Sequence, residues 1–310
     1  MADSNEAAGA GRMRAAVIGL GSMGLGMAMS LLRAGFDVTG CDVSAEAVAR
    51  LVTAGASGAP SPAEAARGAD VVVSVVVNAA QTELVLFGEG GAASAMKPSS
   101  VFISSATMDP DVVRGLAARV EALGCHYLDA PMSGGAQRAS EGALTFLASG
   151  SGAAFAQARP ALNGMAAKVY ELGSEPGQGA AFKMINQLLA GVHIAAASEA
   201  ITFAAKQGLD IAKVYQVITA SAGNSWMFEN RIPHVLDGDY TPRSAVEIFV
   251  KDLGIVQDMA RSARFPVPMA AAALQMFLMT AGAGMGRDDD ASVARLYAQV
   301  SGTGLPGGKS

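Results

Sequence analysis

The stretch Ala16-Val17-Ile18-Gly19-Leu20-Gly21-Ser22-Met23-Gly24 joins a short apolar run to three glycines with GxGxxG spacing. At such a strand-to-helix turn, Gly19 permits the tight turn, Gly21 lets a pyrophosphate approach the backbone, and Gly24 allows close packing of helix on strand. The helix N-terminus presents free N–H groups to phosphates. The spacing alone is weak evidence, because a chain with 37 glycines also forms ordinary glycine-rich turns.

The residues around this turn favour a dinucleotide site. Arg14 to Ile18 is typical of a strand, Met23 to Ala34 of a helix, and Phe36 to Asp42 of a second strand that ends in an acid. Asp42 lies close to the position, about 20 residues on, of the acid that binds the adenosine ribose hydroxyls. Because its carboxylate would repel a 2′-phosphate and no arginine follows it, the sequence predicts NAD rather than NADP.

Composition describes a compact soluble protein. Charged residues make up 16% of the chain, hydrophobic ones 51%, and the net charge is −5, which argues against a nucleic-acid or anionic-membrane partner. No continuous apolar run has the length of a membrane span, and the first dozen residues lack the apolar core of a signal peptide. Two cysteines without CxxC spacing are typical of cytosolic thiols. We therefore expect a cytoplasmic protein.

Strand and helix alternate along the first half of the chain, as a parallel sheet requires. The valine-rich run Asp70 to Val77 is a predicted buried strand, followed by strands over Val101 to Ser104 and His126 to Asp129. Leu144 to Ser149 is expected to continue this sheet, and Lys168 to Leu172 to be a last short strand. The prediction is a Rossmann-type, doubly wound α/β domain over residues 13–175.

From Gly179 onward the pattern is almost entirely helical. The helix predicted up to Gln207 is apolar nearly all round and about 45 Å long at 1.5 Å per residue, so other helices or a second subunit must cover it. We expect an all-helical substrate and dimerisation domain over residues 176–300, tails at 1–12 and 301–310, and a homodimer or homotetramer.

Four motifs carry a family resemblance. They are the glycine turn already quoted, Asp129-Ala130-Pro131-Met132-Ser133-Gly134-Gly135, the segment from Gly177 to Asn186, and Lys251-Asp252-Leu253. In this order, across residues 13 to about 300, they resemble the β-hydroxyacid dehydrogenase family, which includes 3-hydroxyisobutyrate dehydrogenase and tartronate semialdehyde reductase. The resemblance implies NAD-dependent oxidation of a small, carboxylate-bearing hydroxy acid.

Lys183 is the candidate general acid/base. Alcohol oxidation needs a base for the hydroxyl proton as hydride leaves, and burial among apolar neighbours favours the neutral amine that accepts it. A lysine that merely reaches past its neighbours to solvent is the alternative. Asn186 and Gln187 share a helix face with Lys183 and are expected to bind substrate hydroxyls. The family often has a second asparagine where this chain has Gln187.

The resemblance assigns further residues. The turn Ser133-Gly134-Gly135 is expected to hold the substrate carboxylate through backbone N–H groups, although glycines in this position also suit an ordinary turn. Thr107 is the one residue of its segment that keeps the family pattern, and it implies a contact with the nicotinamide ribose. Asn78, which follows the valine-rich strand, is a further cofactor-binding candidate.

Two more candidates lie in the helical half. Lys251 resembles the lysine that closes over the nicotinamide, whereas a Lys-Asp pair on a helix is otherwise most often a solvated feature. Trp226 is a candidate wall of the substrate pocket, with core packing an equal alternative. Within the family, Trp226 to His234, Asp239 to Pro242 and Phe249 to Leu253 are similar to enzymes that oxidise the C2 hydroxyl of a four-carbon sugar acid.

Other functions have less support. The sequence has no Tyr-x-x-x-Lys pair, and its three histidines are scattered without a cysteine cluster, so we expect neither a short-chain dehydrogenase mechanism nor a metal site. 3-Hydroxyisobutyrate oxidation and reduction of tartronate or succinic semialdehyde remain alternatives within the family. A non-catalytic NAD-binding interaction module is the alternative of a different class.

Overall fold

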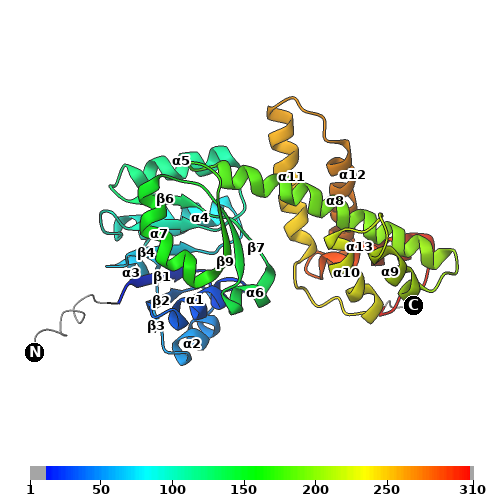
Figure 1. Cartoon of the computed structure of the whole chain (residues 1–310), viewed down its shortest axis with the longest axis horizontal. Helices are drawn as coiled ribbons and strands as arrows, with labels where there is room; N and C mark the ends of the chain where they lie inside the picture. Colours follow the sequence, from blue (N-terminus) through cyan, green and yellow to red (C-terminus); the bar gives the residue numbers. More distant parts are fainter. Residues whose placement is uncertain (1–11, 308–310) are drawn as a thin grey trace, which may run out of the picture. The chain divides into compact units, whose positions relative to one another are not determined.

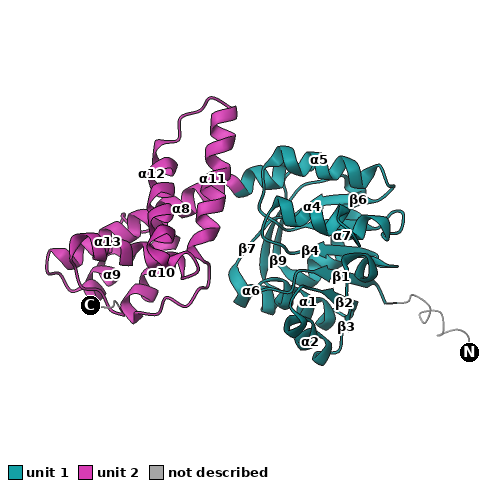
Figure 2. Ribbon diagram, turned by 180° about the vertical axis from the view of Figure 1, so that it is seen from behind, with its two compact units in different colours: residues 1–183 teal, residues 184–310 magenta. Residues whose placement is uncertain are grey.

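The computed structural model describes residues 12–307, and its chain divides into two compact units, residues 1–183 and 184–310 (Figures 1 and 2). The predicted tails at 1–12 and 301–310 fall partly on residues 1–11 and 308–310, which lie outside the described residues.

Unit 1 is built on a six-stranded parallel sheet. Its strands are β1 (Arg14–Ile18), β2 (Asp37–Cys41), β3 (Ser57–Gly58), β4 (Val71–Ser74), β5 (Val101–Ser104) and β6 (His126–Asp129), in the order β3-β2-β1-β4-β5-β6. The predicted Rossmann-type fold is therefore confirmed. The order reverses between β1 and β4, and ligands of such sheets bind at the carboxyl ends of the strands beside that reversal.

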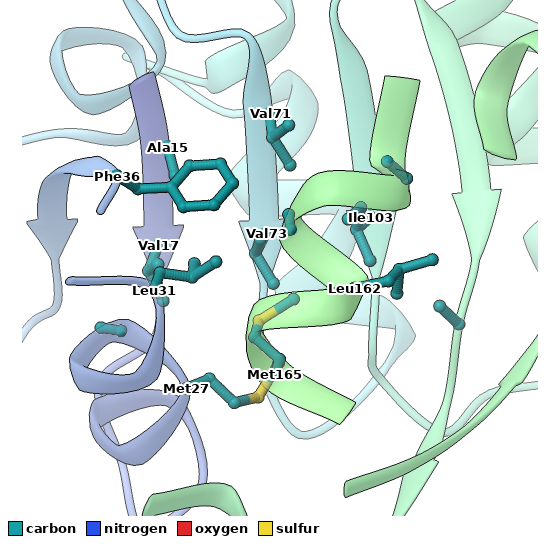
Figure 3. Close-up of a cluster of buried hydrophobic side chains, with 14 of the residues drawn as sticks. Ala15, Val17, Met27, Leu31, Phe36, Val71, Val73, Ile103, Leu162 and Met165 are labelled. Atoms are coloured by element: carbon teal, nitrogen blue, oxygen red, sulfur yellow. The ribbon is translucent and has the colours of Figure 1, made fainter. Parts of the chain in front are cut away.

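Helices cover both faces of this sheet. One face packs against α1 (Gly24–Arg33), α2 (Ala45–Thr53) and α7 (Gly152–Met165), and the other against α3 (Pro62–Ala66), α4 (Ala79–Phe87) and α5 (Pro110–Glu121). Figure 3 shows Met27 and Leu31 of α1 and Leu162 and Met165 of α7 among the valines of β1 and β4. Val17 and Val73 are wholly buried there, as the apolar strand pattern predicted.

The expectation that Leu144 to Ser149 continues the six-stranded sheet is wrong. This segment forms β8 (Leu144–Ala148) in a separate sheet of three strands, between β7 (Met132–Ser133) and β9 (Ala166–Glu171). Gly134 and Gly135, with φ of 143° and 77°, turn the chain into the short helix α6 (Gly135–Glu141). β8 then returns antiparallel to β7, because the connection reverses the chain instead of crossing over the large sheet.

Two helices were not predicted, α4 and α6, and the valine-rich strand is shorter than expected because it ends at Ser74. The side chain of Asn78 accepts a hydrogen bond from the backbone N–H of Gln81 at 2.9 Å and so caps the start of α4. An asparagine in this position is a standard N-cap. The apolar run Val75 to Val77 therefore leads into a helix and does not lengthen the strand.

Unit 2 is helical in its described residues. The long helix α8 (Gln178–Lys206) continues into it from unit 1, and the elements that follow are α9 (Ile211–Thr219), α10 (Trp226–Asp237), α11 (Val246–Ser262), α12 (Pro268–Thr280), a π-helical turn (Ala281–Met285), a 3-10 turn (Asp290–Ser292) and α13 (Val293–Ser301). Met184 and Ile194 of α8 pack with Phe249, Leu253 and Phe277 in one core cluster. The prediction of a helical C-terminal region is confirmed.

By length and composition, α8 and the segment Pro268–Met285 are apolar enough to cross a membrane, although no such run was expected from the sequence. A core helix of a soluble protein has the same composition. Ile194, Ile201 and Phe277 of these segments are wholly buried within the protein.

Candidate active site

The glycine turn between β1 and α1 has the geometry that its spacing predicts. Gly19 has φ +92°, a left-handed conformation that favours glycine. A Cβ on Gly24 would overlap the carbonyl oxygen of Gly19, whereas a Cβ on Gly21 would meet no atom within 4 Å. Gly21 and Ser22 are exposed. The turn thus packs tightly on its protein side and leaves open backbone on the side where a pyrophosphate would lie.

Asp42 lies directly after β2 and bonds to this turn. Its Oδ2 accepts the N–H of Leu20 at 2.5 Å, and its Oδ1 accepts the N–H of Ser44 at 2.7 Å. A carboxylate has about four acceptor positions, so these two bonds leave acceptors for ribose hydroxyls. An open glycine turn beside a half-exposed acid fits a dinucleotide. A hollow beside the turn is lined by Leu20, Gly21, Ser22, Leu25, Gly26, Met29, Arg50, Ala136 and Ser140.

Three other predicted positions follow strands of unit 1 at their carboxyl ends. Asn78 comes after β4 and caps α4, Thr107 comes after β5 and is half-buried, and the Ser133 turn comes shortly after β6. Ser133 is exposed and pairs with Thr145 of β8. The carboxyl ends of the parallel strands are therefore followed by the cofactor candidates of unit 1 and by the carboxylate candidate.

Lys183 is on α8 and is only 8% exposed, so it does not reach freely into solvent. The start of its helix is bound to the end of β6 through Asp129, a residue that the sequence interpretation gave no role. Asp129 Oδ2 accepts the N–H groups of Gly177 at 3.0 Å and Ala180 at 2.8 Å. Burial raises the pKa of Asp129 to about 6, while these backbone bonds and the Ser149 hydroxyl act in the opposite direction.

In unit 2, a chain of polar contacts runs from α8 to α11. The Asn186 amide donates to Gln187 Oε1 at 2.9 Å, the Gln187 amide donates to Asp252 Oδ2 at 2.6 Å, and Asp252 Oδ1 pairs with Lys251 Nζ at 2.5 Å. Asp252 is 1% exposed, so the solvated-surface interpretation of the Lys-Asp pair is wrong. Asp252 holds two of the predicted residues in place, and no sequence signal beyond its neighbour Lys251 pointed to it.

Aromatic residues at the start of α10 separate into two environments. Phe228 is buried and stacks with Tyr215 at a centroid distance of 6.0 Å, whereas Trp226 is 61% exposed. Core packing therefore accounts for Phe228 and not for Trp226. Nearby, the Asn224 amide donates to Thr219 O and Glu229 Oε1.

Within residues 12–307, no group of three or more His, Cys, Asp and Glu side chains has an arrangement that could hold a metal ion. Both cysteines, Cys41 and Cys125, are buried free thiols.

Known proteins resemble this chain over nearly its whole length. A family model described as the NAD-binding domain of 6-phosphogluconate dehydrogenase matches residues 14–173, and one described as NAD-binding of NADP-dependent 3-hydroxyisobutyrate dehydrogenase matches residues 177–297. The L-threonate dehydrogenase of Cupriavidus necator is 53% identical over 94% of this chain and 97% of its own. That of Escherichia coli is 48% identical over 95% of this chain and 97% of its own.

Among solved structures, the crystal structure described as 3-hydroxyisobutyrate dehydrogenase from Salmonella typhimurium has a TM-score of 0.87 and 49% sequence identity. The match covers 92% of this chain and 99% of that one.

The glycine turn yields a matched pair of variants. Gly24→Ala should lower the free energy of unfolding by about 1–3 kcal/mol, because its Cβ meets backbone that has no room to move. Gly21→Ala should leave stability unchanged but weaken NAD binding at least tenfold, about 1.4 kcal/mol, because the new methyl group projects into open space beside the phosphates. Urea denaturation and NADH fluorescence titration measure the two effects. Equal NAD affinity for Gly21→Ala and the wild type would contradict this role.

The pKa of Asp129 sets the sign of a stability change with pH. Because the folded value of about 6 lies above the ordinary value of 3.8, the native state binds more protons than the unfolded chain between these values, and stability falls as pH rises through them. Asp129→Asn does not titrate there. The difference in unfolding free energy, wild type minus variant, should therefore decrease by about 1–3 kcal/mol between pH 4.5 and 7. A difference that stays constant would refute the shift.

Proposed function

The chain belongs to the β-hydroxyacid dehydrogenase family, and within the NAD-dependent chemistry of that family we propose that it oxidises the C2 hydroxyl of L-threonate to 2-dehydro-L-erythronate. The observation that carries the proposal is the near-complete coverage and high identity of the chain with proteins named L-threonate dehydrogenase. The segments Trp226 to His234, Asp239 to Pro242 and Phe249 to Leu253, which resemble that enzyme, support it as well.

NAD supplies the hydride acceptor when bound. The glycine turn from Gly19 to Gly24 would hold its pyrophosphate and Asp42 its adenosine ribose, with Asn78, Thr107 and Lys251 at the nicotinamide half. Asp42 supports a preference for NAD over NADP, because a second negative charge beside a carboxylate is unfavourable.

Lys183 would carry the proton transfer. Its neutral amine accepts the proton of the C2 hydroxyl as the C–H bond gives up its hydride and the carbonyl forms, and the ammonium returns that proton in the reverse reaction. The low exposure of Lys183 supports this role, because a buried amine would exchange its proton with the bound substrate rather than with bulk water.

The remaining residues would bind and orient the substrate. The backbone of Ser133, Gly134 and Gly135 would hold its carboxylate, and Asn186 its hydroxyls. Since the amide of Gln187 is already bonded at both ends, to Asn186 and Asp252, we assign it the orientation of Asn186. The exposure of Trp226 leaves it available as a wall of the pocket.

We also propose a cytoplasmic homodimer or homotetramer. Phe182, Ile185 and Leu189 of α8 are 54%, 60% and 50% exposed and recur at helical spacing, as on a face that meets another subunit. Such a face is consistent with either a dimer or a tetramer.

A panel of hydroxy acids tests the substrate. NAD reduction should proceed with the highest kcat/KM for L-threonate. D-Threonate presents the same hydroxyls in the inverted configuration, and 3-hydroxyisobutyrate and glycerate have fewer hydroxyls for the polar groups on α8. The solved relative named 3-hydroxyisobutyrate dehydrogenase makes that compound the main competitor. A higher kcat/KM for 3-hydroxyisobutyrate or glycerate would reject L-threonate and keep the family chemistry. If none of these hydroxy acids is oxidised, the alternative of a non-catalytic NAD-binding interaction module would be favoured.

Replacement of Lys183 tests the proton transfer. Lys183→Ala should lower kcat by about 10²–10⁴-fold, the usual contribution of a general acid/base. Lys206→Ala is a matched control, because Lys206 ends the same helix and donates to Ser301 O at 2.8 Å far along the helix from Lys183. Its kcat should be unchanged. Steady-state kinetics with circular dichroism as a folding check measures both, and a kcat within a few-fold of wild type would remove Lys183 from the mechanism.

A further inference from the structure

The first turn of α8 has an unusual cap. The residue before the helix is Gly177, which has no side chain to accept the free N–H groups of the first turn. Asp129 and Ser149 supply the acceptors instead, from positions 51 and 30 residues away in sequence from the amides that they bind. A local cap moves together with its helix, whereas Asp129 is the last residue of β6 and Ser149 directly follows β8.

The contacts form a closed set. Asp129 Oδ2 accepts the N–H groups of Gly177 and Ala180, and it also accepts the Ser149 hydroxyl at 3.3 Å. The Ser149 oxygen in turn accepts the N–H of Gly179 at 2.9 Å. Asp129 and Ser149 are themselves joined by two backbone hydrogen bonds of 3.0 and 2.8 Å. Both ends of the cap are therefore fixed to the two sheets of unit 1.

Glycines on the helix side make this approach possible. Gly177 has φ +100°, which favours glycine. A Cβ on Gly179 would overlap the carbonyl oxygen of Leu147 and lie 3.1 Å from Asp129 Oδ2. Any side chain at Gly179 would thus push the helix away from Asp129. The backbone conformation therefore explains Gly177, and the close contact explains Gly179.

Both acceptors of this cap are buried. Asp129 is 1% exposed and Ser149 is wholly buried, so water does not compete for the three amides. The other carboxylate oxygen of Asp129 is buried without a hydrogen-bond partner in the described structure. Burying an acid with one oxygen unsatisfied is expensive, and an ordinary serine or threonine N-cap would bind the helix at lower cost.

We propose that Asp129 and Ser149 are positioning residues that fix the start and rotation of α8 and thereby place the amine of Lys183 for proton transfer. Lys183 lies three residues after Ala180, so it is close to one helical turn from the last amide of the cap. A displacement of about 1 Å at a reacting group can reduce turnover about 10²-fold. This inference rests on the proposed role of Lys183.

Variants of the full-length enzyme test it with NAD and the best substrate of the panel. Asp129→Ala should lower kcat about 10–100-fold while the NAD dissociation constant stays within about threefold, because the displaced helix carries Lys183 and Asn186 whereas the cofactor-binding candidates of unit 1 lie elsewhere. Asp129→Asn keeps an oxygen that accepts the same amides, so it should recover most of the lost kcat. Ser149→Ala, which removes one acceptor, should have an intermediate effect.

Asp70→Asn is the control. Asp70 also accepts a backbone N–H, that of Arg14 at 2.8 Å, but it lies before β4 at the opposite end of the strands. Its kcat should be unchanged. Hydrogen exchange gives a readout besides activity, since the amides of Gly179 and Ala180 should exchange faster in Asp129→Ala than in Asp70→Asn. If Asp129→Ala does not fold, Ser149→Ala and Asp129→Asn carry the test.

A double-mutant cycle separates this inference from the function that it rests on. If Asp129 acts through Lys183, adding Asp129→Ala to Lys183→Ala should cause no further loss of kcat. A full additional loss in the double variant, a loss of NAD affinity parallel to kcat, or a folded Asp129→Ala enzyme with wild-type kcat would overturn the positioning role. Wild-type activity of Lys183→Ala alone would instead reject the catalytic assignment, and the positioning role with it.

Discussion

The register of the parallel strands is the constraint on which the rest of the structure depends. Ile18 pairs with Ser74, Ser74 with Ser104, and Ser104 with Asp129, so the carboxyl ends of four strands form one line across the sheet. Most candidate residues of unit 1 come directly after these strand ends. The glycine turn, Asn78, Thr107 and the Ser133 turn all come within a few residues after it, and Asp129, at its end, binds the helix that carries Lys183.

Much of this line could be predicted from the sequence because its signals are local. The first two strands, the glycine spacing and the acid after β2 occur within about 30 residues, and the Rossmann-type fold was predicted from them and from the strand and helix alternation that follows. The errors occurred where local signals were weak or shared. The run Val75 to Val77 looks like strand but leads into α4, and Leu144 to Ala148 has a strand pattern that does not say which sheet it joins.

The parts that could not be predicted depend on contacts distant in sequence. Asp129 and Ala180 are separated by 51 positions, and Gln187 and Asp252 by 65. Propensity and periodicity do not encode such pairs. The family resemblance named Lys183, Asn186 and Lys251, but it did not indicate the buried carboxylates of Asp129, which binds the start of α8, and of Asp252, which contacts Gln187 and Lys251. Burial of acids beside the candidate residues is the physical feature that only the three-dimensional structure made visible.

The bond between Asp42 and Leu20 has a consequence for the evolution of the cofactor site. The carboxylate that we propose to disfavour a 2′-phosphate also accepts the N–H of Leu20, so cofactor choice and the shape of the glycine turn would be coupled through one side chain. Replacing Asp42 with a neutral or basic residue would make room for the extra phosphate. The same replacement would remove the hydrogen bond that Asp42 accepts from the turn. A change of cofactor preference made at Asp42 would therefore call for a second substitution that restores the hydrogen bond to the turn.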